Sequence, residues 1–319
     1  MKEVLYTKYN SLRKPEFQIK TSILADGDNR YVIKQAMNDK AKLKLQTMKE
    51  NHKLLSDAYK DIKVIPYIET EDGLKFEFIK GKSLLDGVDF AHESIDDIVD
   101  KVKKALDIVL DIDDRYIEEF KMSDEFSRLF PDCNPEGEKS YKIANIDSIF
   151  SNFVNVDGEI WCIDYEWVLD FDVPVDFVIY RILSSLYTDN ERTFGKRICF
   201  EDFCAKVSFP VDRLPLYQNM GKCFNDYIYG DDLKYIYVNN YAKKNITINE
   251  LNEELFSKEQ NINNLQAHIQ AREQHIKNLE AENNGQALYI KKVKKAMKNP
   301  FYGAKVIVKK SYNKLRKSK

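Results

Sequence analysis

Three polar side chains have the types and the spacing that transfer of a phosphoryl group requires: Asp147, Asn152 and Asp164. Residues 153–156 alternate like a half-buried strand, and Asp157-Gly158 is a hairpin turn signal before a second strand that ends at Asp164. The hairpin should therefore bring the three side chains together at its open end. There the first acid could orient an attacking hydroxyl, while the amide and the second acid hold Mg²⁺ on the phosphates of ATP.

A small α+β lobe is expected before this stretch. Alternating apolar residues indicate five strands, and a segment of helical composition separates the third strand from the fourth. The expected strands cover residues 4–9, 17–23, 31–34, 64–68 and 74–79, and the helix covers 39–59.

Lys34 ends the third strand in a Val-Ile-Lys run, and Glu50 follows on the expected helix. In kinase sites, a helix glutamate fixes a strand lysine and directs it to the α- and β-phosphates of ATP. By itself, a strand-end lysine in a chain with 50 basic residues is most simply a solvated charge. Its position before Asp147 is what indicates a function.

A hinge is expected at residues 81–84, between two lobes. Backbone groups of Glu77 to Ile79 could meet the edge of an adenine ring there. Apolar residues at helical spacing begin the second lobe. The lobes are expected over 1–80 and 81–243, with a core helix over 95–120.

The composition is that of a globular protein with a strongly basic end. Of the 319 residues, 43% are hydrophobic, but no apolar run is long enough to span a membrane as a helix. The N-terminus lacks a signal-peptide core, and five scattered cysteines indicate reduced thiols in the cytoplasm rather than a metal site. Residues 291–319 contain twelve Lys or Arg and no acid, which leaves −14 on the remainder. Such a tail indicates an anionic partner surface, either phospholipid or nucleic acid.

From Ile248 the sequence repeats every seven residues. Lys258 and Arg272 interrupt one of its two apolar series. This heptad predicts self-association through a coiled coil over 244–286. The first apolar series, at heptad position a, is mainly isoleucine, and the second, at position d, is leucine; this combination favours a parallel dimer. The charged residues at position d weaken the packing of a dimer, so a trimer is the alternative. The competing interpretation is a single helix packed on the second lobe. The apolar positions are 248, 255, 262, 269 and 276, with 251, 265 and 279.

The last segment, 287–319, has the pattern of a basic amphipathic tail. Two helices are expected, over 288–298 and 304–317, separated by Asn299-Pro300. On the second helix apolar residues share one face and lysines fill the rest, which is typical of helices that lie in an anionic bilayer surface. Docking on an acidic partner enzyme and nucleic-acid binding are the competing interpretations. We expect membrane binding and no nucleic acid.

Together these residues resemble the protein-kinase-like superfamily, in particular its small-molecule branch. Asp147 and Asn152 match the catalytic-loop pattern, and residues 163–167, Ile-Asp-Tyr-Glu-Trp, resemble the Ile-Asp-Phe-Glu-Tyr signature of choline and ethanolamine kinases. Over 4–240 the chain is similar to the kinase domain of the kinase–methyltransferases that terminate bacterial O-antigen polysaccharides. Segments 8–17, 145–152, 163–167 and 177–181 carry this similarity, and the coiled coil and tail fit it. The methyltransferase domain is not found in this sequence.

The resemblance implies roles at single positions. Lys34 would bind the ATP phosphates with Glu50 as its anchor, and Asp147 would be the catalytic base. Asn152 and Asp164 would bind Mg²⁺. The remaining roles concern Glu166, which would assist at the metal or only hold the loop, and Asp176, which would brace the catalytic loop.

One departure from the pattern lies between the first two strands, where no glycine-rich loop is found. Ser11, Arg13 and Lys14 stand in its place, and their side chains could contact phosphates. The residue two before the catalytic aspartate is Asn145 rather than the usual histidine.

The resulting expectation is an ATP- and Mg²⁺-dependent kinase. Its glycan acceptor would be a sugar hydroxyl at the end of a lipid-linked surface polysaccharide, and its tail would hold it on the inner face of a bacterial plasma membrane. The main alternative is an inactive kinase-like scaffold that oligomerises and recruits glycosyltransferases. A third hypothesis is a kinase for choline or an aminoglycoside.

Overall fold

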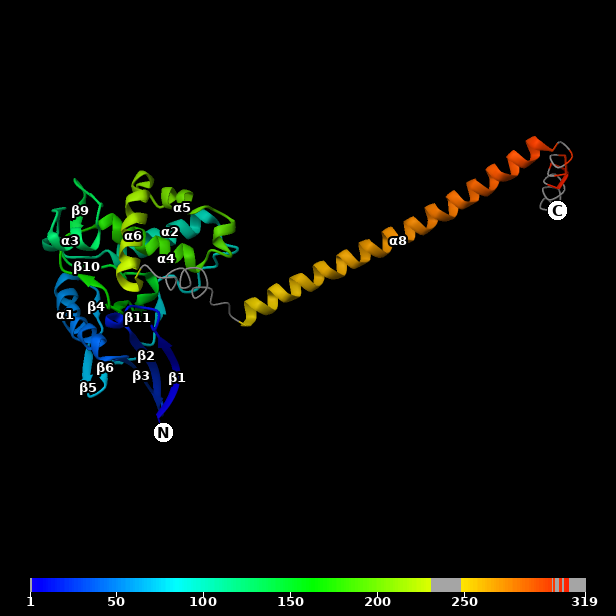
Figure 1. Ribbon diagram of the computed structural model, residues 1–319. Coiled ribbons are helices and arrows are strands. Elements are labelled where there is room, and N and C mark those ends of the chain that lie inside the picture. Colours follow the sequence, from blue (N-terminus) through cyan, green and yellow to red (C-terminus); the bar gives the residue numbers. More distant parts are fainter. Residues whose placement is uncertain (1, 231–247, 300, 302–303, 306, 310–319) are drawn as a thin grey trace. The chain divides into compact units, whose positions relative to one another are not determined.

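The computed structural model describes residues 2–230, 248–299, 301, 304–305 and 307–309. The chain divides into two compact units, residues 1–244 and 245–319. The first unit is an α+β domain, with a sheet-rich lobe followed by a helical lobe (Figure 1). This is the fold class that the sequence predicts.

The first lobe is an antiparallel sheet with the strand order β1-β2-β3-β6-β5, and α1 packs beside it (Figure 1). Alternation along the strands turns Ile19, Leu74 and Phe76 into the core. Lys34 on β3 pairs with Leu74 on β6, which fixes the lysine within the sheet. The elements are β1 (Lys2–Tyr9), β2 (Ile19–Asp26), β3 (Asn29–Ala36), α1 (Lys42–Ala58), β5 (Tyr67–Thr70) and β6 (Gly73–Glu77).

The single strand expected over 64–68 is instead two short strands in different sheets. β4 (Lys63–Val64) pairs in parallel with β12, whereas β5 pairs with β6. Pro66 lies between them, and proline has no N–H with which to continue a ladder. The chain therefore changes sheets at this point.

The predicted hairpin is confirmed. β11 (Phe153–Val156) and β12 (Glu159–Cys162) are antiparallel, and their two turn residues, Asp157 and Gly158, have φ of 52° and 95°. Two positive φ values are what a tight turn of this kind needs. β7 (Lys82–Ser83), within the expected hinge, pairs with β11. A Cβ on Gly81 would lie 2.4 Å from the Val154 side chain, so the hinge backbone approaches β11 closely because position 81 is glycine.

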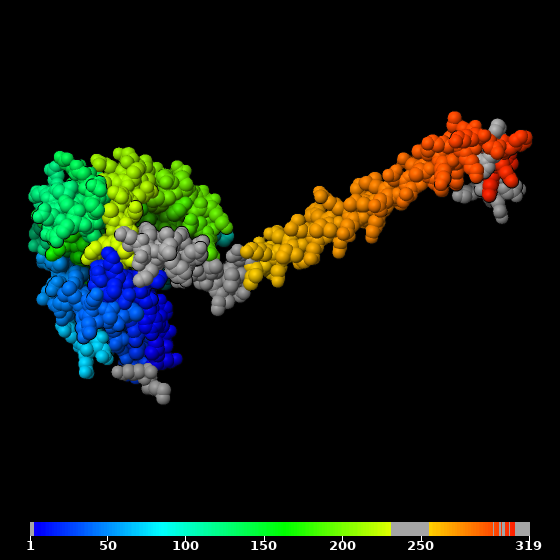
Figure 2. Space-filling model, in the orientation of Figure 1, coloured from blue at the N-terminus to red at the C-terminus, as the bar shows by residue number. Residues whose placement is uncertain are grey.

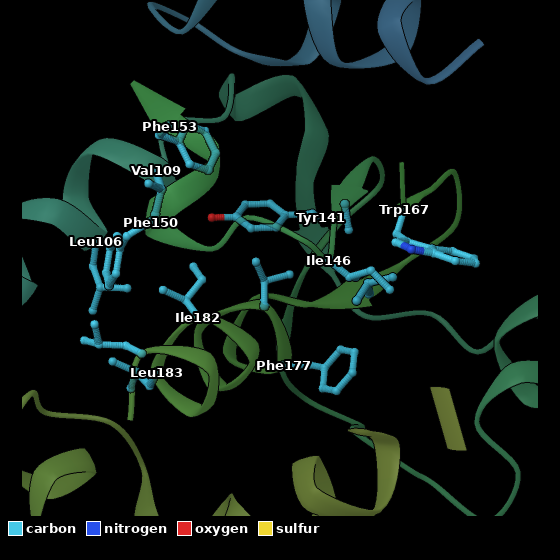
Figure 3. Packing of buried hydrophobic residues seen from close by; sticks show 14 of the residues in the cluster. Leu106, Val109, Tyr141, Ile146, Phe150, Phe153, Trp167, Phe177, Ile182 and Leu183 are labelled. Atoms are coloured by element: carbon cyan, nitrogen blue, oxygen red, sulfur yellow. The ribbon is translucent and has the colours of Figure 1, made fainter. Parts of the chain in front are cut away.

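The described part of the second lobe packs five α-helices around the loop that carries the site. Phe150 of that loop lies among Ile182 and Leu183 of α4 and Leu106 of α2 (Figure 3). In the space-filling view this lobe, green to yellow, packs directly on the blue first lobe (Figure 2). The helices are α2 (Ile95–Val109), α3 (Asp124–Leu129), α4 (Val175–Asp189), α5 (Phe200–Lys206) and α6 (Leu214–Tyr229), and the short strands are β8 (Ile117–Glu119), β9 (Lys139–Tyr141), β10 (Ala144–Asn145), β13 (Val168–Leu169) and β14 (Val173–Pro174).

The helix expected over 95–120 ends early, at Val109. Ile112 forms a bridge to Tyr59, and the Asp113 side chain accepts a hydrogen bond from Arg115 N, which starts a new turn. An aspartate that caps a turn competes with continuation of the helix. The remaining expected helical residues therefore belong to this turn and to β8.

The described part of the second unit is dominated by one helix, α8 (Ile248–Lys298). It continues through 283–285, where the heptad pattern stops, so 288–298 is not the separate helix that we expected. It ends directly before Asn299-Pro300, as predicted, because proline cannot continue a helix. Most of the helix expected over 304–317 lies outside the described residues. No helix among those described is both long and apolar enough to cross a membrane.

Candidate active site

The hairpin brings the predicted residues together. Asp147 and Asn152 lie in the loop between β10 and β11, and Asp164 follows β12. The Asn152 Nδ2 donates to Asp147 O at 2.9 Å, and Ile163 N donates to Asn152 O at 2.9 Å. Asn145 holds the start of this loop, because its Oδ1 accepts a hydrogen bond from Asp147 N at 3.1 Å. These bonds fix the spacing of the three side chains.

Lys34 is buried and forms an ion pair with Asp164, with 2.7 Å between Nζ and Oδ1. Burial lowers the pKa of Lys34, but the negative charges of Asp164 and Glu166 outweigh this and raise the pKa above its usual value. Burial likewise raises the pKa of Asp164, and Lys34 brings it below its usual value. Both groups are therefore charged at neutral pH.

Glu50 is not the anchor of Lys34, because its side chain is exposed on the outer face of α1. The buried face of α1 instead presents Lys44 and Asn51 to the backbone after Asp164. Asn51 Nδ2 donates to Tyr165 O at 2.8 Å, and Lys44 Nζ donates to Glu166 O at 2.8 Å. The helix thus positions the segment of Asp164 rather than the lysine.

Sequence reasoning missed Lys44 and Asn51. Burial lowers the pKa of Lys44 to about 8, and its Nζ lies 3.2 Å from the centroid of the Trp167 ring. A signal was present: Lys44 and Asn51 share helical spacing with Met48 and Leu55 on the packed face. Polar residues at such positions need buried partners.

A cavity of about 400 Å³ lies between the lobes, with Lys34, Asn152 and Asp164 among its lining residues. Most of the other lining side chains are apolar, as the flat ring of a purine base requires. Glu77 and Ile79, which were expected to meet the edge of the adenine ring, both line it. The other lining residues are Tyr6, Thr21, Ile23, Val32, Ile65, Phe76, Phe78, Gly81, Ser83, Val154 and Ile163.

The loop between β1 and β2 folds onto the second lobe. Arg13 forms an ion pair with buried Glu166, and Lys14 N donates to Ile228 O at 2.8 Å. Phe17 packs edge-on against Trp167, with 5.1 Å between ring centroids. Of the two roles expected for Glu166, the structure supports that of holding a loop.

The three residues of this loop that were expected at the phosphates differ in position, and the Lys14 ammonium lies over the Tyr227 ring, 5.9 Å from its centroid. Arg13 lies within the site: its charge opposes the rise that burial causes in the pKa of Asp147, and it adds to the effect of Lys34, which holds the pKa of Asp164 below its usual value. Ser11 is exposed, and its carbonyl accepts a hydrogen bond from Gln18 Nε2 at 3.0 Å. Only Arg13 is therefore close to the predicted phosphate position.

The oxygen donors present suit Mg²⁺. Asn152 uses Nδ2 to hold the loop, which leaves Oδ1 for a ligand, and Asp164 uses Oδ1 for Lys34 and Glu166 N, which leaves Oδ2. Mg²⁺ commonly takes one or two protein oxygens together with phosphate oxygens and waters. Among the described residues, no group of three or more His, Cys, Asp or Glu could hold a metal ion.

Asp176 does not brace the catalytic loop as expected. It begins α4 near Glu138; burial and the charge of Glu138 raise its pKa. Arg181, one to two turns later on α4, contacts the loop instead. Its Nε donates to Ile146 O and its Nη2 to Asp147 Oδ1, both at 3.4 Å.

Replacing Arg181 by leucine is expected to shift the acid limb of the pH–rate profile to higher pH. Burial raises the pKa of Asp147, Arg181 opposes this, and Asp164 and Glu166 add to the rise. The expected base, Asp147, can accept a proton only as a carboxylate, so we expect activity to fall as the pH drops through its pKa. Without Arg181 that pKa rises further, and the fall starts at higher pH.

The profile is obtained by measuring kcat/KM between about pH 5 and pH 9. Arg192→Leu, at an exposed position just after α4, is the matched control and should leave the profile unchanged. An unshifted acid limb in the Arg181 variant would show that this contact does not tune the base.

No protein-family model matches the chain, and neither does any curated protein. Some solved structures are similar to this chain. A macrolide 2′-phosphotransferase from Brachybacterium faecium has 12% sequence identity and a TM-score of 0.37, and the match covers 75% of this chain and 89% of that chain. Choline kinase LicA from Streptococcus pneumoniae has 17% identity and a TM-score of 0.40, and the match covers 70% of this chain and 85% of that chain. A spectinomycin phosphotransferase in complex with ADP and spectinomycin has 13% identity and a TM-score of 0.39, and the match covers 76% of this chain and 85% of that chain. With TM-scores below 0.5, these similarities do not assign a fold or an activity to this chain.

Proposed function

We propose that this protein is an ATP- and Mg²⁺-dependent phosphotransferase that acts on an alcohol group. One observation carries the proposal: a cleft between the lobes is lined by Lys34, Asn152 and Asp164, and Asp147 lies in the same loop as Asn152. A cation, an amide and an acid that line a mostly apolar pocket, with a second acid in the adjoining loop, are the parts that phosphoryl transfer needs.

Each side chain then has a defined task. The Lys34 ammonium binds the α- and β-phosphates, and the Asp147 carboxylate accepts the proton of the attacking hydroxyl. When bound through Asn152 and Asp164, Mg²⁺ offsets the charge of the phosphates. Arg13 carries a further cation over the site and can exchange Glu166 for a phosphate oxygen.

The proposed acceptor is a sugar hydroxyl at the end of a lipid-linked surface polysaccharide, at the cytoplasmic face of the membrane. The basic tail supports this location, because twelve Lys or Arg in residues 291–319 would attract anionic phospholipid. The test is transfer of labelled γ-phosphate to lipid-linked glycans extracted from bacterial membranes. Mg²⁺-dependent labelling of the glycan is expected, and labelling of no glycan despite ATP binding would contradict the acceptor.

A non-catalytic scaffold is the second candidate, and one observation favours it. The polar groups of the site are paired with each other, Lys34 with Asp164 and Arg13 with Glu166. Such pairs can hold the lobes together without a nucleotide. Mg²⁺-dependent ATP binding would count against a pure scaffold, because the ion pairs would have to open for it.

We also propose that α8 associates with α8 of a second or third copy. Its heptad side chains are exposed in the single chain: Ile262 by 53%, Ile269 by 56% and Ile276 by 54%. Exposed apolar residues at a seven-residue period are buried when such helices pair. Pairing would also bring several basic tails together and strengthen membrane binding through avidity.

Ile269→Asp in the full chain is expected to dissociate this assembly. An aspartate at an a position places an unpaired charge in the seam, and loss of the isoleucine alone costs about 2–5 kcal/mol per chain. Sedimentation velocity measures the shift to monomer. Gln270→Asp, on the next position of the helix, is the control and should keep the wild-type oligomer. A monomeric wild type at micromolar concentration would rule out the coiled coil.

A further inference from the structure

Helix α4 carries a row of polar side chains that starts at the proposed base. Arg181, Ser185 and Asp189 are four residues apart, so they follow one face of the helix. Arg181 contacts Asp147, as described above. The row therefore leads from the base along α4, beside the apolar face formed by Phe177, Val178, Ile182, Leu183 and Leu186.

A small cavity of about 130 Å³ lies along this row. Ser185 and Asp189 line one side of it, and residues 149–151, which belong to the loop between Asp147 and Asn152, line another. Ser83, within the expected hinge, lines both this cavity and the proposed nucleotide pocket. The cavity is thus bordered by the loop of the base and by the edge of the nucleotide pocket, where an acceptor has to lie.

The lining has the chemistry of a site for an uncharged polyhydroxyl compound. The hydroxyls of Ser83, Ser151 and Ser185 can both donate and accept, and the Asp189 carboxylate accepts. Ile149 and other apolar side chains can pack on the C–H surface of a ring. No lysine or arginine is among the described lining residues, so that lining offers no cation to an anionic acceptor. The volume of the cavity is well below the roughly 300 Å³ at which pockets for drug-sized ligands begin, so the cavity fits one ring at most.

We infer that this cavity is the acceptor subsite, and that it binds the terminal, uncharged sugar ring of the acceptor. The inference rests on the proposed function. It adds the location of the acceptor and its chemical class: neutral and rich in hydroxyls. Ser185 is the central contact, because it lies on α4 between Arg181 and Asp189.

The experiment compares Ser185→Val with Ser184→Val, a neighbouring substitution on the same helix that does not touch the cavity. The acceptor probes are methyl glycosides of glucose, galactose, mannose and rhamnose, with choline as a cationic, non-sugar probe. KM is measured separately for the probe and for ATP. We expect Ser185→Val to raise the KM of the best glycoside about tenfold, because the valine removes a hydroxyl partner and narrows the cavity. The KM of ATP should stay unchanged, and Ser184→Val should behave like the wild type.

The other outcomes separate the two proposals. If the wild type binds ATP with Mg²⁺ but phosphorylates no glycoside, or prefers choline, the sugar subsite is wrong and the nucleotide site stands. If both serine variants raise the KM of the glycoside equally, the acceptor binds elsewhere. If the wild type does not bind ATP with Mg²⁺, the proposed function itself fails.

Discussion

The Asp164→Asn variant is expected to lose at least about a thousandfold in kcat/KM for phosphoryl transfer. Asp164 supplies the negative oxygen that would draw Mg²⁺ to the nucleotide, and an amide oxygen is a much weaker ligand for a divalent ion. Asparagine is a better choice than alanine here. Its Oδ1 can still accept from Lys34 Nζ and Glu166 N, as the carboxylate does.

Alanine at position 164 would leave the buried Lys34 without its partner, and breaking a buried ion pair costs about 3–5 kcal/mol. Loss of activity in that variant could then reflect unfolding. The control for charge alone is Asp170→Asn, an exposed acid six residues further on. Activity of Asp164→Asn close to that of the control would contradict its role at the metal.

Asp147→Asn is expected to reduce kcat by about 10²- to 10⁴-fold, the usual contribution of a general base. The amide keeps the shape of the side chain but cannot take the proton of the attacking hydroxyl. Asp147 contacts Arg181 through its side chain and holds Asn152 through its backbone carbonyl. The substitution therefore leaves the proposed metal ligands in place, and affinity for ATP should be retained.

This split between kcat and nucleotide affinity separates the two acids. Asp164→Asn should weaken binding of ATP in the presence of Mg²⁺, whereas Asp147→Asn should not. Both constants are obtained from initial rates at varied ATP together with an equilibrium titration. Equal loss of ATP affinity in the two variants would show that Asp147 acts in binding and not as a base.

The hairpin and its three polar residues could be predicted because the signals are local. Asp157-Gly158 specifies a tight turn, and the alternation in 153–156 specifies the strand before it. Once the hairpin forms, Asn152 and Asp164 must lie at the same end of it. The pairing of β3, which carries Lys34, with β2 follows in the same way from a short turn and alternating residues.

Other features depend on contacts between distant segments, and the sequence did not reveal them. Glu50 and Asn51 are neighbours, but a turn of about 100° per residue puts one in solvent and the other against Tyr165 O. Which of them faces the site depends on how α1 rests on the sheet. The pair of Arg13 with Glu166 spans 153 residues and forms only when the β1–β2 loop closes on the second lobe. Local patterns carry no information on such a closure.

Equilibrium titration of the full chain with ATP tests the nucleotide site most directly. We expect saturable binding that requires Mg²⁺, is lost with EDTA and is strongly weakened in Asp164→Asn but retained in Asp170→Asn. ATP binding that is equally strong with and without Mg²⁺, or no binding at all, would contradict the assignment of Lys34, Asn152 and Asp164 to a kinase site.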